Sequence, residues 1–163
     1  MKTKIKCLTS VFLTITMLLS IIVVAPIMVN ASEDDLTYGD FTYEVNNDGS
    51  CTITDYEGKS ADVSIPSTIC GHKVTKIGGA AFGYNESIKS VIVPNGVTNI
   101  DVGAFECCDN LTKVSLPDTI TYIDAYAFAY NEKLADISIP NDVEYVGESA
   151  FEETKWLNDQ PNG

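Results

Sequence analysis

Apolar residues recur along the chain at a fixed interval of 23 residues. Each repeat carries an Ala-Phe pair, an apolar residue six positions after the phenylalanine, and an isoleucine or valine five positions before it. Three prolines follow the same interval, at Pro94, Pro117 and Pro140. The phenylalanine column consists of Phe82, Phe105, Phe128 and Phe151. A period of this length predicts a solenoid in which each coil buries its apolar face against the next coil.

Within a repeat, the pattern predicts two short extended segments and a turn. In Val114–Leu116 the first and third residues are apolar, so they face inward and Ser115 faces solvent. Pro117 cannot donate a ladder hydrogen bond and therefore ends this strand. Residues 119–123 form the second segment, and the Ala-Phe turn follows. Strands of successive coils are expected to stack in parallel, with the phenylalanine rings inside.

The segment before the repeats predicts a β-hairpin. Phe41, Tyr43 and Val45 alternate with polar residues, and the same alternation returns after the turn residues 46–49, where Gly49 supplies a positive φ. We therefore expect a flexible acidic lead-in over 32–39 and a hairpin that caps the first coil, together spanning 32–62. The repeats then occupy 63–163, with five extra residues before Ile77 and an incomplete last repeat. That ending indicates either a truncated piece of a larger protein or a last coil that contacts a partner.

Residues 44–55 also match part of a calcium-binding loop. Acidic or amide side chains stand at positions 1, 3, 5 and 12, and glycine stands at position 6. Flanking helices and a terminal glutamate are missing, so the hairpin is the favoured interpretation and no metal site is predicted.

The first 31 residues predict a secretory signal peptide. Three lysines precede an apolar run, and Val29-Asn30-Ala31 places small residues at a cleavage site before Ser32. A membrane-spanning anchor is the alternative, since the run is long enough to cross a bilayer. After cleavage the sequence shows no second apolar span, which predicts a secreted or surface-associated protein.

The remaining chain is strongly acidic. The whole sequence has 10 basic and 23 acidic residues, and removal of Lys2, Lys4 and Lys6 changes its formal charge from −13 to −16. Such a chain repels phosphate backbones, so nucleic acid is excluded as a partner.

The cysteine and histidine residues give little indication of a metal site or a catalytic site. With one histidine, the spacing of Cys51, Cys70, Cys107 and Cys108 resembles no zinc site, and a Cys51–Cys70 disulfide or buried free thiols remain alternatives. His72 lies two residues from Cys70 on a turn, which is no basis for a nucleophile pair. We expect no catalytic residues and no cofactor.

A second column is polar. Asn85, Cys108, Asn131 and Thr154 each follow a phenylalanine by three residues, where a compact side chain can bond the buried backbone of the turn.

The combined pattern Ile-x-x-x-Ala-Phe-x-x-Cys/Asn-x-x-Leu-x-x-Val-x-Leu/Ile-Pro over residues 63–157 resembles the BspA-type leucine-rich repeat of bacterial surface and secreted proteins. The resemblance implies a β-rich leucine-rich-repeat solenoid with an N-terminal hairpin cap, displayed outside the cell. It also implies binding to an extracellular protein or matrix ligand, without catalysis. A structural spacer with no ligand of its own is the alternative function.

Repeat scaffolds bind through rows of equivalent surface positions. The outward positions of the first strand and the tyrosines of the second segment are therefore the candidate binding surface: Ile92, Lys113, Ser115, Ser138, Tyr122 and Tyr145. The alternative is that the tyrosine rings simply pack against neighbouring coils.

Overall fold

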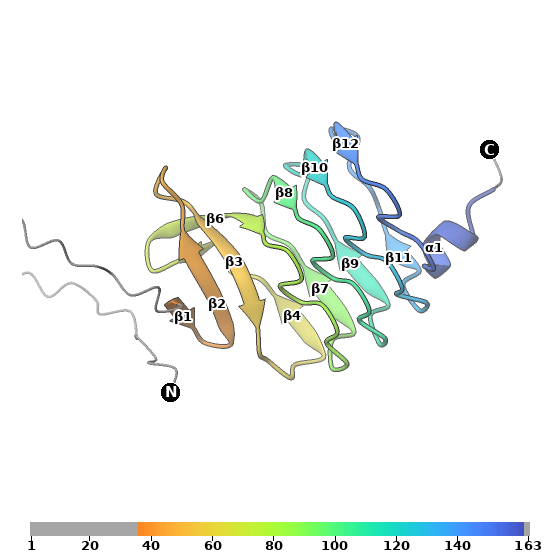
Figure 1. Cartoon of the computed structure of the whole chain (residues 1–163), viewed down its shortest axis with the longest axis horizontal. Helices are drawn as coiled ribbons and strands as arrows, with labels where there is room; N and C mark the ends of the chain where they lie inside the picture. Colours follow the sequence, from red (N-terminus) through yellow and green to blue (C-terminus); the bar gives the residue numbers. More distant parts are fainter. Residues whose placement is uncertain (1–35, 162–163) are drawn as a thin grey trace, which may run out of the picture.

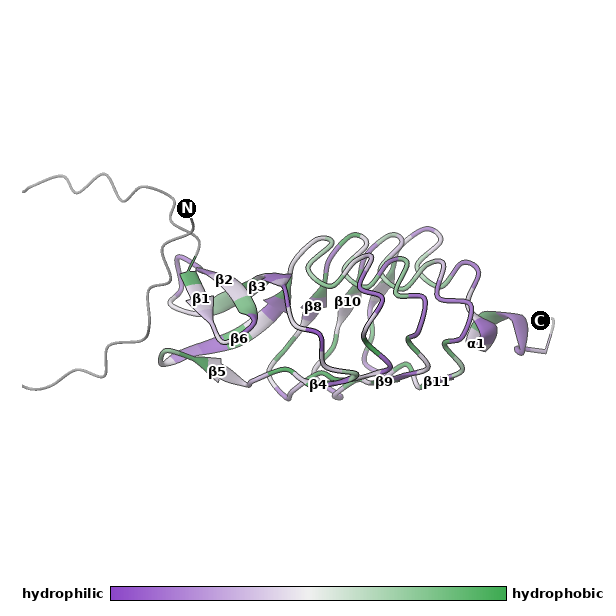
Figure 2. Ribbon diagram, turned by 90° about the horizontal axis from the view of Figure 1, so that it is seen from below, coloured by the Kyte–Doolittle hydropathy of each residue, from purple (hydrophilic) through white to green (hydrophobic). Residues whose placement is uncertain are grey.

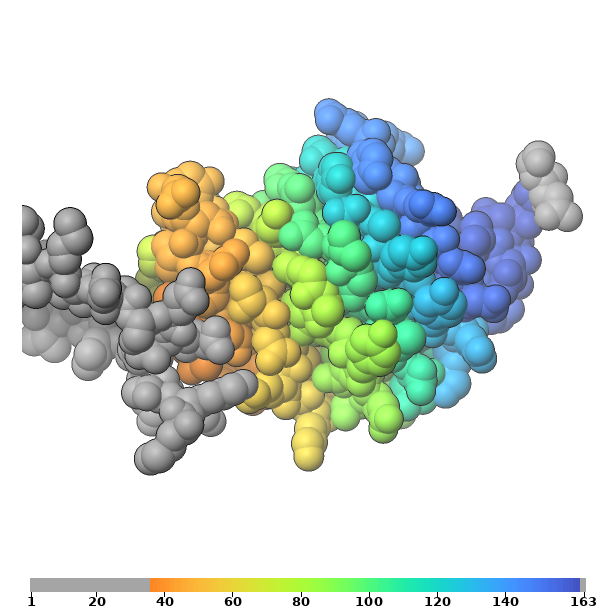
Figure 3. Space-filling model, viewed as in Figure 1, coloured from red at the N-terminus to blue at the C-terminus, as the bar shows by residue number. Residues whose placement is uncertain are grey.

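The computed structural model describes residues 36–161 and shows a β-solenoid of stacked coils (Figure 1). Each coil contributes one strand to each of two sheets. Sheet A runs in the order β1-β2-β3-β6-β8-β10-β12, with the short strand β5 (Thr68–Ile69) paired to β6, and sheet B runs β4-β7-β9-β11. Successive coils pack as parallel bands across the molecule (Figure 3). The predicted leucine-rich-repeat architecture is confirmed.

The strands of the regular coils are two or three residues long. Sheet A contains β6 (His72–Ile77), β8 (Asn99–Ile100), β10 (Tyr122–Ile123) and β12 (Tyr145–Val146). Sheet B contains β4 (Asp62–Ser64), β7 (Ser90–Ile92), β9 (Lys113–Ser115) and β11 (Asp136–Ile137). Residues 23 apart face each other in parallel pairs, as in Tyr122↔Tyr145 and Val91↔Val114. The strands of sheet B begin one residue earlier than the sequence predicts.

The hairpin cap consists of β2 (Phe41–Val45) and β3 (Cys51–Tyr56), joined by the turn at Gly49, whose φ is 83°. These strands pair antiparallel, and β3 pairs in parallel with β6, so the cap extends sheet A. The Gly49 backbone N–H donates to the Asn46 carbonyl at 2.9 Å, which closes the turn. Because the hairpin covers the first coil, Cys51 and Ile53 are fully buried.

One prediction for the lead-in is wrong. Leu36–Tyr38 forms β1, which pairs antiparallel with β2 instead of remaining a flexible segment. The outer edge of β2 offers unpaired backbone groups, and a three-residue strand is enough to pair them. The predicted signal peptide lies outside the described residues.

The core is an aromatic ladder, as predicted. Phe82 and Phe105 lie 4.8 Å apart between ring centroids, and the next two steps along the column are 5.3 Å each, with interplanar angles between 1° and 18°. Aliphatic side chains line the inner faces of the sheets; Ile77, Ile100 and Ile123 are fully buried. In the last coil the corresponding Val146 is 49% exposed, because nothing in residues 36–161 covers it.

At both ends of the ladder, an aromatic ring from outside the phenylalanine column extends the stack. Tyr56 stacks on Phe82 with a centroid separation of 5.2 Å, so the cap adds one more ring. At the other end, helix α1 (Lys155–Asn158) places the ring of Trp156 4.9 Å from Phe151 at a 50° tilt. The sequence predicted the start of another repeat here, with Leu157 in the apolar column, yet Leu157 is 45% exposed.

The polar column bonds the turns as predicted. Asn131 Nδ2 donates to the carbonyls of Phe105 (2.8 Å) and Phe128 (2.7 Å), and its Oδ1 accepts from the backbone N–H of Cys108 at 2.8 Å. Thr154 Oγ1 donates to the Phe151 carbonyl at 2.7 Å. Each of these side chains stabilises backbone groups that would be costly to bury unpaired.

Candidate functional site

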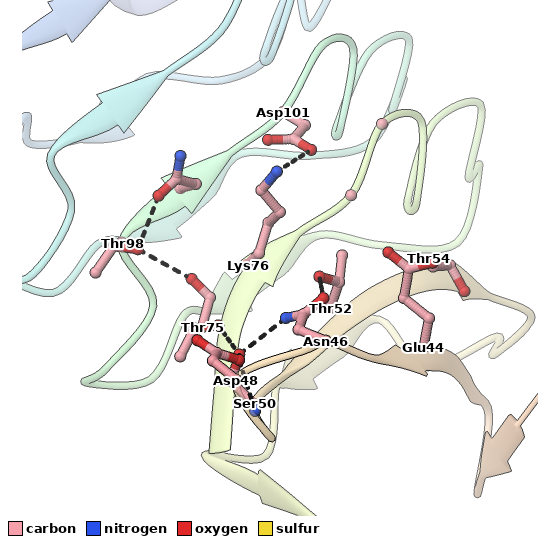
Figure 4. Close-up of a pocket in the computed structure, with 13 residues that line it drawn as sticks. Glu44, Asn46, Asp48, Ser50, Thr52, Thr54, Thr75, Lys76, Thr98 and Asp101 are labelled. Atoms are coloured by element: carbon pink, nitrogen blue, oxygen red, sulfur yellow. Dashed lines mark hydrogen bonds and ion pairs between the residues drawn. The ribbon is translucent and has the colours of Figure 1, made fainter. Parts of the chain in front are cut away.

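A polar groove lies on the outer face of sheet A, where β3, β6 and β8 lie side by side (Figure 4). Its volume is about 370 Å³. Residues facing outward on the hairpin form one wall, and residues of the first two coils form the rest. The lining side chains are Glu44, Asn46, Asp48, Ser50, Thr52, Thr54, Thr75, Lys76, Thr98, Asn99 and Asp101, with Gly78 and Gly79.

Strand alternation explains why these side chains are polar. Thr52 and Thr54 alternate with Cys51 and Ile53, so they point away from the core, although the groove walls leave Thr52 only 3% exposed. Asn99 precedes the buried Ile100 in the same way. The groove is therefore the solvent side of the same strands that line the core.

Hydrogen bonds hold the hairpin wall in place (Figure 4). Asn46 Nδ2 donates to Ser50 Oγ at 2.9 Å, Thr52 Oγ1 donates to Asn46 Oδ1 at 3.1 Å, and Thr75 Oγ1 donates to Ser50 Oγ at 3.0 Å. The last of these bonds crosses from the cap to the first coil. A ligand would meet side chains that are already ordered, which lowers the entropic cost of binding.

The groove is negative. Hydrogen bonds from the Ser50 hydroxyl and backbone N–H lower the pKa of Asp48, so its carboxylate is charged at neutral pH. Lys76 Nζ lies 3.1 Å from Asp101 Oδ2, and this pair leaves Glu44 and Asp48 as excess charge. The arrangement therefore suits a ligand rich in hydrogen-bonding groups or positive charge.

The groove continues into the predicted tyrosine row. Strand register places Lys76, Asn99, Tyr122 and Tyr145 in one line across sheet A. The rings of Tyr122 and Tyr145 stack with their centroids 4.5 Å apart and an angle of 14° between their planes. Tyr145 is nevertheless 45% exposed. Its ring therefore packs against the neighbouring coil and is still accessible to a ligand.

The other predicted surface residues lie on sheet B. Ile92, Ser115 and Ser138 are exposed, as alternation predicts, and Ile92 is 54% exposed. Lys113 Nζ pairs with Asp136 Oδ2 at 2.7 Å across neighbouring coils. The six candidates thus divide between two sheets and do not form one continuous row.

Within residues 36–161, the hydrogen bonds of Cys51, Cys107 and Cys108 do not include the His72 imidazole. Cys51, Cys107 and Cys108 are free thiols, so the Cys51–Cys70 disulfide considered from the sequence does not form. His72 Nδ1 donates to the Gly49 carbonyl at 2.8 Å, because a carbonyl only accepts. Burial raises the pKa of Cys51, and it raises that of Cys108 to about 12.

Sequence reasoning missed the groove itself. Its wall was considered as a β-hairpin turn, with a calcium loop as the less favoured alternative, and not as part of a groove, although Glu44, Asn46 and Asp48 line it. Among residues 36–161, no three histidine, cysteine, aspartate or glutamate side chains gather closely enough to hold a metal ion. Within the same range, no helix has the length and apolar character needed to cross a bilayer.

Comparison with known proteins assigns the family. Residues 54–160 match the BspA type leucine rich repeat region, in six copies. The chain therefore belongs to the BspA-type leucine-rich-repeat family. A search of curated proteins finds no match.

Solved structures with the same fold come from several bacteria. A leucine-rich repeat protein from Bacteroides capillosus ATCC 29799 is 31% identical, with a TM-score of 0.69, over 76% of this chain and 94% of that one. The T. pallidum leucine rich repeat protein is 27% identical, with a TM-score of 0.59, over 69% of this chain and 64% of that one. A leucine-rich repeat protein from Bacteroides ovatus ATCC 8483 is 25% identical, with a TM-score of 0.65, over 74% of this chain and 33% of that one.

Proposed function

We propose that this protein is a secreted or cell-surface module that binds another protein, or an extracellular matrix ligand, without catalysis. The contact surface is the outer face of sheet A, from the polar groove to Tyr122 and Tyr145. The observation that carries the proposal is the continuity of these features across the strands β3, β6, β8, β10 and β12. Tyrosine is enriched at interfaces because it combines a rigid apolar ring with a hydroxyl group.

The choice of sheet A over sheet B follows from shape and charge. Sheet A offers a groove with ordered polar groups beside stacked rings, whereas on sheet B the predicted row carries Ile92, two serines and a lysine already paired with Asp136. The groove's acidic excess would favour partners with positive groups, and it would give binding a dependence on ionic strength.

Two triple variants test whether sheet A is the contact surface. The probes are purified fibronectin, laminin, fibrinogen and collagen, each immobilised and exposed to the full chain. We expect Asn99→Ala/Tyr122→Ala/Tyr145→Ala to weaken binding at least tenfold, and the sheet B control Ile92→Ala/Ser115→Ala/Ser138→Ala to change it less than twofold. Equal affinity for both variants contradicts the assignment of sheet A. No binding to any probe favours the spacer function instead.

Export is tested separately. Expression of the full chain in a bacterial host with a general secretion pathway is expected to give a product in the medium or on the surface that begins at Ser32. Mass measurement of the N-terminal peptide decides this. A product that retains Met1 and stays in the membrane supports the anchor alternative.

A further inference from the structure

The turns that carry the Ala-Phe pairs form a row along one edge of the solenoid (Figure 2). Each turn holds two residues in the left-handed region of φ. The first position contains Ala80, Gly103, Tyr126 and Ser149, and the second contains Tyr84, Cys107, Tyr130 and Glu153, with φ between 54° and 61° throughout. Only one of the eight is glycine, the residue that adopts this conformation without strain.

The tyrosines at these positions are unfavourable for the backbone. A bulky side chain in the left-handed region brings its Cβ close to the following carbonyl oxygen, whereas glycine or asparagine is tolerated there. Tyr84, Tyr126 and Tyr130 therefore each cost folding stability. Strained positions of this kind persist where the side chain has another use.

Burial does not account for all three tyrosines, and least of all for Tyr84. Tyr84 is 68% exposed, and Tyr130 and Tyr126 are 40% and 36% exposed. Val102, in the turn between Tyr84 and Tyr126, is 50% exposed. The edge thus presents aromatic and apolar surface to solvent across three consecutive coils.

Carboxylates accompany these rings. The Tyr84 backbone N–H donates to the Glu106 carbonyl at 2.8 Å, and the Tyr130 backbone N–H donates to the Glu152 carbonyl at 2.8 Å, so each glutamate lies next to its tyrosine. The charge of the glutamate is the main cause of the raised pKa of Tyr84 and of Tyr130. The four turn segments 80–86, 103–109, 126–132 and 149–155 contain six acidic residues and one lysine. An acidic carboxylate beside an aromatic face is suited to a cationic side chain, which both groups attract.

The spacing of the rings fits an extended peptide. Tyr84 and Tyr130 occupy the same column two coils apart, which corresponds to about 10 Å at a strand spacing of about 4.8 Å. A polyproline II segment rises about 3.1 Å per residue, so residues i and i+3 lie on one side about 9.3 Å apart. Basic residues at every third position of such a segment would meet successive acidic and aromatic groups.

We propose that the edge formed by Tyr84, Glu106, Tyr126, Tyr130 and Glu152 binds an extended, proline-containing segment of a partner protein with a lysine or arginine at every third residue. This surface is separate from the groove on sheet A, so the two contacts can fail or succeed independently. The segment lies along the solenoid axis and crosses the four turns that carry these residues.

The probe is the peptide (Arg-Pro-Pro)₄, titrated into the full chain by calorimetry at 50 mM and 150 mM salt. A peptide of the same composition with its four arginines grouped at one end controls for nonspecific attraction to an acidic protein. We expect the regular peptide to bind at least tenfold more tightly than the grouped one. Equal affinity of the two peptides, or no binding by either, overturns the proposal.

Variants locate the contact. Tyr84→Ala/Tyr130→Ala and Glu106→Gln/Glu152→Gln should each weaken binding of the regular peptide at least tenfold. The control Asp118→Asn/Asp142→Asn removes two exposed charges near the proline turns and should change the affinity less than twofold. If the control variant loses as much affinity as the edge variants, the binding is nonspecific and the proposal is wrong.

A thermal measurement excludes a merely structural role for the tyrosines. Tyr84→Asn/Tyr130→Asn places a residue that tolerates left-handed φ in both turns. We expect a midpoint of unfolding equal to or above that of the unmodified chain, together with loss of peptide binding. A lower midpoint would mean that the rings stabilise the coil stack, and it would overturn the argument from strain.

Discussion

The rings of Phe105 and Phe128 are parallel within 1°, with centroids 5.3 Å apart. Both side chains are fully buried, and each lies between two other aromatic rings of the ladder. The stack forms because consecutive coils repeat in register and offer the same position to the ring above and the ring below.

Replacement of a central ring should therefore destabilise the fold severely. We expect Phe105→Ala to lower the free energy of unfolding by about 3–5 kcal/mol, because it removes a buried ring and leaves a cavity between Phe82 and Phe128. Urea unfolding measures this value. The control is Phe105→Leu, which keeps apolar volume and should cost less. Equal midpoints for Phe105→Ala and the unmodified chain would contradict the role of the ladder.

The buried amide of Asn131 should be equally sensitive. Asn131→Ala leaves two carbonyls and one backbone N–H without their partner, so we expect a loss of about 3 kcal/mol or more. Asn131→Cys is the matched control, because Cys108 occupies this column one coil earlier and its thiol donates to the Phe82 carbonyl at 3.1 Å. In chemical unfolding, the free energy of unfolding of Asn131→Cys should lie between that of Asn131→Ala and that of the unmodified chain.

Thiol labelling should distinguish Cys107 from the buried thiols. Cys51 and Cys108 are fully buried, whereas Cys107 is partly accessible. Desolvation and then the charges of Glu106 and Asp109 raise the pKa of Cys107, so its reactive thiolate becomes more abundant only as the pH rises toward 9 and above. With iodoacetamide, peptide mapping should show Cys107 modified before Cys51 and Cys108, and faster at pH 9.5 than at pH 7.5. Faster modification of Cys108 in the folded protein would contradict its burial.

The ionisation of Cys108 predicts a loss of stability in alkali. Burial raises the pKa of its thiol from 9.0 to about 12, so between these values the unfolded state loses its proton while the folded state keeps it. The protonated Cys108 thiol therefore makes its full contribution to the free energy of unfolding below pH 9. This contribution is lost as the pH rises toward 12, by a few kcal/mol in total. Cys108→Ser does not titrate and should show a shallower decline between pH 9 and 11 in thermal unfolding. Identical pH profiles for both proteins would exclude the effect.

The periodic part of the structure could be predicted from the sequence, because every coil repeats the same physical requirement. Phe105 is fully buried for the same reason as Phe128, and Asn131 follows from the need to satisfy the backbone of the turn. These positions depend on local pattern alone.

Features that depend on single long-range contacts could not be predicted in the same way. β1 forms because β2 offers a free edge, and α1 is only four residues long, too short to show a helical period. The groove exists because β3 pairs with β6, which brings Asn46 near Thr75 through Ser50. Lys76 and Asn99 belong to a repeated column, but the hairpin residues Asn46 and Ser50 do not, so only the fold reveals that the two sets form one groove.

The first coil contains a hairpin that the later coils lack. β5 (Thr68–Ile69) pairs antiparallel with β6 through the turn at Gly71, yet Lys76 and Ile77 remain in register with Asn99 and Ile100. The stack thus absorbs additional chain length at this corner without a change in the coils below it. An antigenic peptide or affinity tag could be grafted between Ile69 and His72 for display, with the scaffold preserved.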